Sequence, residues 1–443
     1  MTPMLWFIEL EFEFEFEFEY SWGMKQGTRN TIRGMVVGCF WATAAAAAGQ
    51  TLCDGERFRY TSAFADVTVT QGIVYGANVN AMGASQDLVV DVYEPAGDAA
   101  DGRPLLIIAH GGFFVGGSND GADVVPLCED FARMGYVVAS MSYRLGIDNF
   151  FDLENAMTRA VWRGVHDSRA AVRFFRKSVA EEGNPFRIDA DRIVLGGVSA
   201  GGFIALHHAY VDEASEIPSA VDPNGAGLGG GLEGNSGNPG YSSDVMGIFN
   251  IAGALKTADY LAPGDEPLVS VHGDADATVP FGAGTVYLTM IPVTDVEGSG
   301  VVHETAVELG VNACLEVLEG ADHVPHVSSA AHYDTTLAVV AGRISTWLCD
   351  DFADVCGMYD VSSDVASVVA PATWAPVPNP VVRGGWLAVP ARDAGYRVLD
   401  CSGRVVDEIA PMQSGTRTDH WPAGVVFVVD RASGKAARAL VVD

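Results

Sequence analysis

The sequence predicts an α/β fold, in which a mostly parallel sheet is covered by helices on both faces, followed by a small all-β sandwich. From about Phe58 to Trp347, apolar runs typical of strands alternate with amphipathic segments typical of helices. Residues 360–377 are rich in Val, Ser, Ala and Pro, a composition typical of a linker. The tail that follows contains short alternating strands separated by glycine-containing turns, which is the pattern of a β-sandwich.

The strands and helices of the α/β part can be placed from their patterns. The expected strands are Leu88–Tyr93, Pro104–Ala109, Val137–Met141, Ile193–Gly197, Val245–Ile251, Leu268–His272 and Cys314–Leu318. The expected helices, with apolar residues at three-to-four spacing, are Asp123–Met134, Glu154–Val179, Phe203–Val211 and Ala330–Leu348. The run Pro104–Ala109 is apolar throughout, as expected of a central parallel strand that is buried on both faces.

The N-terminal segment has the order of features found in secretory signal peptides. Met24 is followed by basic residues, a short run of apolar and small residues, and an Ala-x-Ala site that ends at Ala48. The apolar run is shorter than the roughly 20 residues that span a bilayer, which disfavours a membrane anchor. The preceding repeat Glu11–Tyr20 alternates Glu with aromatic residues and is unlike the rest of the chain. We therefore expect a secreted or cell-surface protein whose translation starts at Met24.

These features divide the chain into five segments. Residues 1–23 are interpreted as an artefact upstream of the true start, and 24–48 as the signal peptide. Residues 50–357 form the α/β domain, 358–377 the linker and 378–443 the C-terminal all-β domain.

Composition and charge exclude several classes of partner. Of the 443 residues, 49% are hydrophobic and 19% charged, which is typical of a globular protein. The formal net charge is −31. Nucleic acid and anionic lipid both require clustered Lys and Arg for binding, so neither is an expected partner.

The cysteines fit an oxidising compartment. Removal of Cys39 with the signal peptide leaves an even number: Cys53, Cys128, Cys314, Cys349, Cys356 and Cys401. Cys349 and Cys356 are close enough in sequence to close a small loop, but the pairing stays open. No Cys-x-x-Cys or Cys/His spacing is typical of a metal site, so no metal is expected.

The motif GGVSAGG places a serine at a strand-to-helix turn. Ser199 follows the apolar run of a strand and precedes a helical segment. In a Gly-x-Ser-x-Gly elbow the serine adopts a strained conformation, and the two flanking glycines, here Gly197 and Gly201, let strand and helix approach closely. The sequence therefore predicts Ser199 as a nucleophile at a helix N-terminus.

A glycine loop follows the strand Pro104–Ala109. Acyl transfer requires backbone N–H groups directed at the oxyanion, and glycines permit that approach. One donor is expected from Ala200, the residue after the nucleophile, and the other from Gly111 or Gly112, with Phe113 as a further possibility. His110 precedes the serine and is interpreted as a brace for the loop.

The base and its orienting acid are expected after later strands, in the order Ser, Asp, His. Asp276 lies in GDADATVP and is preferred to Asp274 because it lies further beyond the strand end. His323 lies in EGADHVPH and is preferred to His326, which more plausibly begins or caps the last helix. Either aspartate could instead be a solvated turn carboxylate.

Together these segments resemble a known family. LVVDVYEP, RPLLIIAHGGFFVGGS, VVASMSYRLG and the long segment ending in GGVSAGG are similar to the carboxylesterase and feruloyl/acetyl esterase branch of the α/β-hydrolases, over roughly Leu88–Leu348. The resemblance implies an α/β-hydrolase fold and cleavage of ester substrates through an acyl-enzyme, with no metal or organic cofactor. Many relatives have a third glycine at Phe113, so Phe113 and Phe114 could instead shape the acyl pocket.

The tail carries a second resemblance. Pro378–Pro380, Tyr396–Val406, Pro422–Gly424 and the terminal Val-Val are similar to the C-terminal sorting domain of type IX secretion substrates. This resemblance implies an outer-membrane secretion machinery as partner. A carbohydrate-binding or spacer module is the alternative, but only two tryptophans, Trp386 and Trp421, are available to stack on sugars.

Two further hypotheses about function stay open, a serine peptidase of the same fold and a binding protein that has lost catalysis. The Gly-rich residues 222–242 are expected to form a loop that either borders the acyl pocket or is a solvent-exposed insertion. Asp167, on the long helix, is expected to form a structural ion pair.

Overall fold

The computed structural model describes most of the α/β part and the strands of the tail. The described ranges are 52–53, 57–58, 60, 62–288, 291–349, 381–382, 386–389, 396–400, 405–413, 415–421, 424–430 and 436–442. The expected signal peptide, the segment before it and the linker 358–377 lie outside the described residues. The chain divides into two units, residues 1–48 and residues 49–443.

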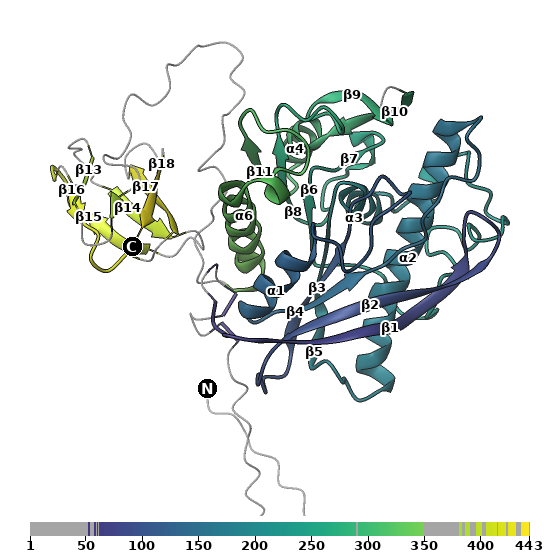
Figure 1. Ribbon diagram of the computed structural model, residues 1–443, viewed down its shortest axis with the longest axis horizontal. Coiled ribbons are helices and arrows are strands. Elements are labelled where there is room, and N and C mark those ends of the chain that lie inside the picture. Colours follow the sequence, from purple (N-terminus) through teal and green to yellow (C-terminus); the bar gives the residue numbers. More distant parts are fainter. Residues whose placement is uncertain are drawn as a thin grey trace, which may run out of the picture. The chain divides into compact units, whose positions relative to one another are not determined.

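The largest sheet among the described residues has eight strands in the order β1-β2-β4-β3-β5-β6-β8-β11 (Figure 1). These strands are β1 (Val67–Val79), β2 (Ser85–Pro95), β3 (Arg103–Ala109), β4 (Val137–Met141), β5 (Ile188–Val198), β6 (Gly247–Ile251), β8 (Leu268–Gly273) and β11 (Ala313–Leu318). β2 is antiparallel to both of its neighbours, β1 and β4, and the pairs from β4 to β11 are all parallel. A mostly parallel sheet of this order fits the α/β-hydrolase fold.

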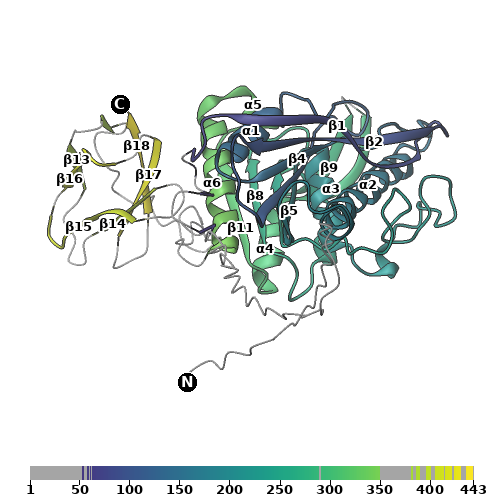
Figure 2. The ribbon, with the colours of Figure 1, turned by 90° about the horizontal axis from the view of Figure 1, so that it is seen from below.

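Helices cover both faces of the sheet (Figures 1 and 2). They are α1 (Val125–Arg133), α2 (Leu153–Glu181), α3 (Ala200–Tyr210), α4 (Ser299–Glu308), α5 (Pro325–Ser328) and α6 (Ala330–Leu348). Successive residues of β3 point to opposite faces. Leu105 and Ile107 pack in a core with α2, α3 and α4, whereas Leu106 and Ile108 pack in a second core with α1 and α6.

The seven predicted strands and four predicted helices are confirmed, the helices as α1, α2, α3 and α6, whereas several other elements were missed. All seven predicted strands correspond to β2, β3, β4, β5, β6, β8 and β11, and the helix Ala330–Leu348 has the predicted bounds. The sequence pattern did not identify β1 or α4. It also missed the three-stranded sheet β7-β10-β9, formed by β7 (Ala254–Leu255), β9 (Ala283–Leu288) and β10 (Ile291–Gly298).

A disulfide joins the start of the described chain to the end of α6. Cys53 and Cys349 are bonded, with their Cα atoms 5.8 Å apart. The suggested loop between Cys349 and Cys356 is therefore wrong, because Cys349 pairs with a residue distant in sequence. Cys314 is also disulfide-bonded. Cys128 is a free thiol in the core, and burial raises its pKa.

Residues 222–242 form an irregular loop, as predicted, but parts of it are buried. A buried ion pair between Arg144 and Asp167 (2.8 Å) holds it in place. Arg144 donates to the carbonyl oxygen of Gly227 (2.6 Å), and the hydroxyl of Ser236 donates to Asp167 (2.6 Å). The predicted structural role of Asp167 is confirmed, and the loop is not a plain solvent-exposed insertion.

The described residues of the tail form two sheets. One has the order β12-β18-β17-β14-β15 and the other pairs β13 with β16. The strands are β12 (Val381–Val382), β13 (Trp386–Ala388), β14 (Tyr396–Asp400), β15 (Val405–Ile409), β16 (Gly415–Arg417), β17 (Gly424–Asp430) and β18 (Ala436–Val442). Trp421 packs in a small core with Leu387, Tyr396 and Val428. Within the described part of the chain, no helix has the length and apolar character needed to cross a membrane.

Candidate active site

Ser199 lies at the sharp turn between β5 and α3. Its backbone has φ 52° and ψ −114°, a region that a non-glycine residue rarely adopts. A Cβ on Gly197 would lie 2.3 Å from the backbone carbon of Gly201, and a Cβ on Gly201 would lie 2.0 Å from the carbonyl oxygen of Ala109. Only glycine fits at both positions, so the two predicted elbow glycines allow strand and helix to meet at this distance.

The three predicted residues lie within hydrogen-bond distance of one another. Ser199 Oγ is 2.8 Å from Nε2 of His323, and Nδ1 of His323 is 2.6 Å from Oδ2 of Asp276. Asp276 follows β8 and His323 follows β11, and parallel strands place the loops after them at one edge of the sheet. An ionised carboxylate only accepts, so Nδ1 carries the proton and Nε2 accepts from the serine hydroxyl.

The carboxylate of Asp276 is buried and fully engaged. Its Oδ1 accepts the backbone N–H groups of Thr278 (2.8 Å) and Val279 (2.9 Å), and its Oδ2 lies close to the imidazoles of His272 and His323. Burial acts to raise the pKa of Asp276, but the hydrogen bonds from both imidazoles, the charge attraction of His323 and the Val279 N–H outweigh it. The pKa of this carboxyl is therefore held well below its usual range.

The alternative residues lie elsewhere. Asp274 accepts the backbone N–H of Gly320 at 2.6 Å and stabilises the turn after β11. His326 lies in α5 and is buried, with Nε2 3.2 Å from the carbonyl oxygen of Asp123. Of the two pairs of candidates, the structure brings only Asp276 and His323 next to Ser199.

The glycine loop differs from the expectation at one position. The N–H of Gly111 donates to Oδ2 of Asp123 at 2.7 Å, so it is not available to an oxyanion in this conformation. Gly112, Phe113 and Ala200 line the cavities that border Ser199, and their N–H groups donate to no other described residue. Of the donors expected from this loop, Gly111 is therefore excluded in this conformation because Asp123 accepts its N–H, and Gly112 and Phe113 stay as the alternatives.

His110 braces this loop, as expected. Its ring stacks on Tyr143 with centroids 4.4 Å apart, and the Tyr143 hydroxyl donates to the His110 carbonyl oxygen (2.9 Å). Phe113 and Phe114 follow with φ 58° and 59°, two consecutive residues in the left-handed region. Such strain persists only where the surroundings enforce it, and here it directs both rings to the wall of a cavity.

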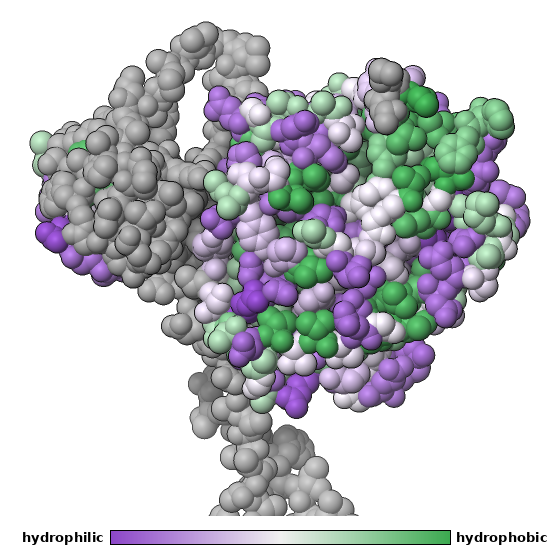
Figure 3. All heavy atoms as spheres, viewed as in Figure 1, coloured by the Kyte–Doolittle hydropathy of each residue, from purple (hydrophilic) through white to green (hydrophobic). Residues whose placement is uncertain are grey.

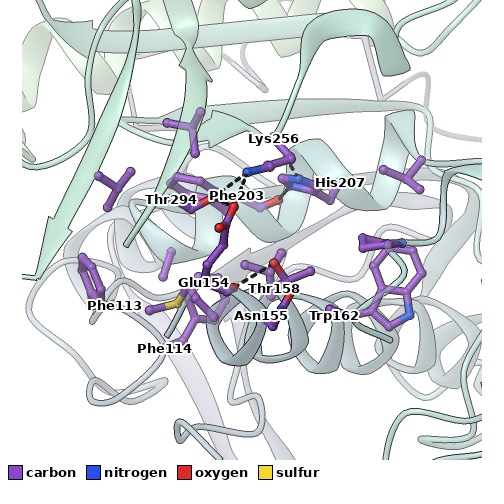
Figure 4. A pocket seen from close by; sticks show the side chains of 18 of the residues that line it. Phe113, Phe114, Glu154, Asn155, Thr158, Trp162, Phe203, His207, Lys256 and Thr294 are labelled. Carbon is purple, nitrogen blue, oxygen red and sulfur yellow. Dashed lines mark hydrogen bonds and ion pairs between the residues drawn. The ribbon is translucent and has the colours of Figure 1, made fainter. Parts of the chain in front are cut away.

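A cavity of about 300 Å³ opens beside Ser199 and Ala200 (Figure 4). Its wall is mostly apolar: Phe113, Phe114, Met157, Val161, Trp162, Phe203, Val211, Val279, Val286 and Val296. Pro218, Ser219 and Ala220 complete it, whereas no residue of 222–242 lines it. Residues 222–242, for which a place beside the acyl pocket was one of two expectations, therefore do not line the cavity, whereas the segment just before them does.

Polar side chains from three separate elements meet in the wall of this cavity. Lys256 Nζ lies 3.1 Å from Glu154 at the start of α2 and 2.7 Å from Thr294 Oγ1 on β10, as the dashed lines in Figure 4 show. His207 also lines the cavity, and burial lowers its pKa to about 4. Its Nδ1–H donates to the Phe203 carbonyl oxygen and its Nε2 accepts the N–H of Lys256, so the ring is neutral. Sequence reasoning missed these residues because they come together only in the fold.

The outer surface near this cavity is partly apolar. Tyr287 on β9 and Ile291 on β10 are exposed, as are Phe150 and Phe151 before α2. Figure 3 shows green, apolar side chains gathered around the β9–β10 hairpin and the start of α2 in the same view as Figure 1.

A second cavity, of about 260 Å³, also borders Ser199. His323, Val324, Thr278 and Asp123 line it together with the glycine loop. Among the described residues, no group of three His, Cys, Asp or Glu side chains is placed to hold a metal ion.

Residues 90–235 match the protein-family model described as BD-FAE. The chain is 34% identical over 123 residues to pyrethroid hydrolase Ces2a of Mus musculus, and 34% identical over 118 residues to carboxylesterase 3 of Homo sapiens. These matches cover 27% and 26% of this chain but only 20% and 19% of the relatives, so the chain matches about one fifth of their length.

Among solved structures, the chain is similar to Thermogutta terrifontis esterase 2. The apo form is 24% identical, and the comparison covers 59% of this chain and 86% of that one with a TM-score of 0.38. The form phosphoramylated by tabun gives a TM-score of 0.39 at 24% identity, with 58% and 84% covered.

Proposed function

We propose that this protein is a carboxylic ester hydrolase that acts through an acyl-enzyme on Ser199, with His323 as general base and Asp276 as its orienting acid. The observation that carries the proposal is the continuous hydrogen-bonded series Asp276–His323–Ser199, which ends at a strained elbow. The match to the BD-FAE model and the partial identity to carboxylesterases support the same reaction class.

The mechanism follows from the atoms in contact. Nε2 of His323 removes the proton from Ser199 Oγ as the oxygen attacks the ester carbonyl carbon. The tetrahedral oxyanion is stabilised by the N–H group of Ala200 and by that of Gly112 or Phe113. Protonated His323, stabilised by Asp276, then donates its proton to the leaving alcohol. Water attacks the acyl-enzyme with the same base, which releases the acid and restores Ser199.

From the position of His323 we infer which part of the ester each cavity binds. Since His323 delivers the proton to the leaving alcohol, the alcohol occupies the cavity that His323 lines, next to Thr278 and Asp123. The acyl group then occupies the larger cavity, which His323 does not line. Its volume of about 300 Å³ and its aromatic and aliphatic wall favour an apolar or aromatic acyl group over acetyl alone.

Export completes the proposal. Residues 24–48 would act as the signal peptide, and residues 378–443 as a β-sandwich sorting domain recognised by the outer-membrane type IX secretion machinery. The disulfide between Cys53 and Cys349 is consistent with an oxidising compartment, and the two tail sheets are compatible with an all-β domain.

The reaction is tested with purified protein and nitrophenyl esters of acetate, butyrate, octanoate and an aryl acid. Wild type should hydrolyse the esters, with the higher kcat/KM on the larger acyl groups. Ser199→Ala should lose at least about ten-thousandfold in kcat, whereas Ser215→Ala, which changes an exposed serine outside the site, should match wild type. Cleavage of peptides without ester turnover would favour a peptidase, and no turnover of either would favour a binding protein.

A further inference from the structure

A second histidine contacts the carboxylate of Asp276. His272 lies near the end of β8, and its side chain is fully buried. Its Nε2 lies 3.2 Å from Asp276 Oδ2, the same oxygen that accepts the Nδ1–H of His323 at 2.6 Å. The Nε2 atom also lies 3.1 Å from the carbonyl oxygen of Val279. Both neighbours are acceptors, so Nε2 carries a hydrogen.

The other side of the His272 ring is held by a buried polar series. Nδ1 lies 2.7 Å from Ser299 Oγ, and Ser299 Oγ lies 2.9 Å from Nδ2 of Asn250. The amide orientation of Asn250 follows from its Oδ1, which accepts the N–H of Gly253 at 2.9 Å. All three side chains come from different elements, β8, α4 and β6, and all are buried.

The direction of these hydrogen bonds can be assigned. Asn250 donates to Ser299 Oγ, and the serine hydroxyl then donates either to Nδ1 of His272 at 2.7 Å or to the carbonyl oxygen of Gly253 at 3.4 Å. The shorter contact is the better hydrogen bond. The series therefore runs from Asn250 through Ser299 and His272 to Asp276, with His272 neutral and protonated on Nε2.

We propose that His272 is a positioning residue for the reaction. Its Nε2–H fixes Asp276 Oδ2, which holds His323 in the reactive tautomer. The same hydrogen bond partly neutralises the charge on Oδ2 and so limits how strongly the protonated form of His323 is stabilised. This inference rests on the proposed function. Neither the resemblance nor the catalytic motif requires a donor at this position. His272 touches neither Ser199 nor the cavities, so it acts only through Asp276.

The arrangement of donors explains why His272 would matter. Thr278 and Val279 hold Oδ1 from the backbone, whereas among the described residues Oδ2 is held only by the two imidazoles. Loss of the His272 donor would leave more negative charge on Oδ2, facing His323. The protonated form of His323 would then be more strongly stabilised, and the base would be inactivated by protonation at a higher pH. The carboxylate would also be less fixed, which lowers kcat rather than raising KM.

Other charged groups near His323 must be considered in a pH experiment. Asp322 accepts the N–H groups of Ala277 and of His323 itself, and His326 lies on the following helix. Asp123 faces the same cavity, and Asp274 is bound to the turn after β11. None of these four contacts His272 by a hydrogen bond, so variants at His272 leave their contacts in place.

The test compares two replacements of similar size. His272→Met removes the N–H donor, whereas the amide of His272→Gln can still donate to Asp276. We expect His272→Met to lower kcat about tenfold at little change in KM, and to move the acid side of the kcat/KM–pH profile upward by about half a pH unit. His272→Gln should keep most of the wild-type kcat and nearly the wild-type pH profile. A role in packing alone predicts that the two variants share one pH profile, and that result would overturn the proposal.

Ser299→Ala provides an independent variant if His272→Met does not fold, as judged by circular dichroism. Without the serine hydroxyl, His272 keeps its Nε2–H but donates more weakly, since hydrogen bonds in a series strengthen one another. The acid side should move in the same direction by a smaller amount, and an unchanged profile would contradict the proposal. Ester turnover by wild type and its loss in Ser199→Ala are measured alongside, so that a failure of the esterase proposal is recognised separately.

Discussion

The two sides of Ser199 are built from different interactions. On the His323 side, each side chain is fixed by hydrogen bonds, from Asn250 through Ser299, His272 and Asp276 to the serine hydroxyl. On the cavity side, the wall is formed by packing of apolar side chains contributed by loops and by several separate elements.

This difference separates the reaction from the choice of substrate. A hydrogen bond is directional, so a change of one atom in the polar series misplaces the base. Packing is less directional, so a change in the cavity wall alters which acyl group fits while the reacting atoms stay in place. Variants on the two sides are therefore expected to affect kcat and acyl preference independently.

The largest effect is expected from Asp276→Asn. The amide cannot hold His323 in the tautomer with hydrogen on Nδ1, and kcat should fall by about ten-thousandfold with all esters alike. Steady-state kinetics on the same ester panel measures it. Asp274→Asn is the matched control two residues away, and it should keep at least half of the wild-type kcat. Equal losses in both variants would mean that the acid has been misassigned.

A change in the cavity wall is expected to alter the acyl preference and to leave the reaction itself intact. Ala220→Trp places a large ring in the wall of the acyl cavity. We expect kcat/KM for octanoate esters to fall by roughly tenfold to a hundredfold while acetate esters are hydrolysed at nearly the wild-type rate. Ala214→Trp, on an exposed 3-10 turn outside the cavity, serves as control. If acetate and octanoate turnover fell together, the cavity would not be the acyl site.

Two buried histidines, His207 in the cavity wall and its neighbour His208, should make stability depend on pH. Burial lowers the pKa of His207 to about 4 and that of His208 to about 3. The unfolded chain binds protons near the ordinary value of about 6.5, so the unfolded state gains protons first as the pH falls. The free energy of unfolding should therefore be fully present above that value and decrease as the pH falls toward 4, by up to ~1.4 kcal/mol per pH unit for each such histidine.

Urea unfolding between pH 7 and pH 4 checks this dependence. His208→Gln removes one of these groups away from the cavity and should flatten the decrease, whereas replacement of the exposed His420 should not. A decrease of the same slope in His208→Gln would show that acid unfolding has another origin.

The smallest effect is expected at Lys256, which is half-exposed and paired with Glu154. Exposed ion pairs contribute little to stability, so Lys256→Met should change the free energy of unfolding by less than about 1 kcal/mol. Its Nζ lies in the cavity wall, so the same variant should change the preference between apolar and hydroxylated acyl groups by a few-fold. An unchanged preference would place the acyl group away from Lys256.

The triad could be predicted from the sequence, whereas the cavity wall could not. Ser199, Asp276 and His323 each follow a strand of the parallel sheet, and their order along the chain was enough to bring them together. Gly111 was one of the expected oxyanion donors, but its N–H is bound to Asp123, which lies 12 residues further along the same connection between β3 and α1, and no local pattern reveals this hydrogen bond. The His272 side chain was read only as part of a strand.

The cavity wall could not be predicted because its residues are distant in sequence. The folded chain brings together residues from five separate segments: Phe113, Trp162, Ala220, Lys256 and Val286. The disulfide between residues 53 and 349 has a sequence separation of 296, which no spacing rule would identify. The β9–β10 hairpin was missed although its strands are longer than β4 and β6, because neither strand has a continuous apolar run.

Reaction with a fluorophosphonate tests the central claim most directly, because the reagent traps an activated serine without requiring the natural ester. Tryptic peptides of the labelled protein are analysed by mass spectrometry, with His323→Ala and Asp274→Asn in parallel. The account predicts one adduct, on Ser199, formed at the wild-type rate in Asp274→Asn and at least about a thousandfold more slowly in His323→Ala. Labelling of another serine, or of Ser199 at the same rate without His323, would contradict it.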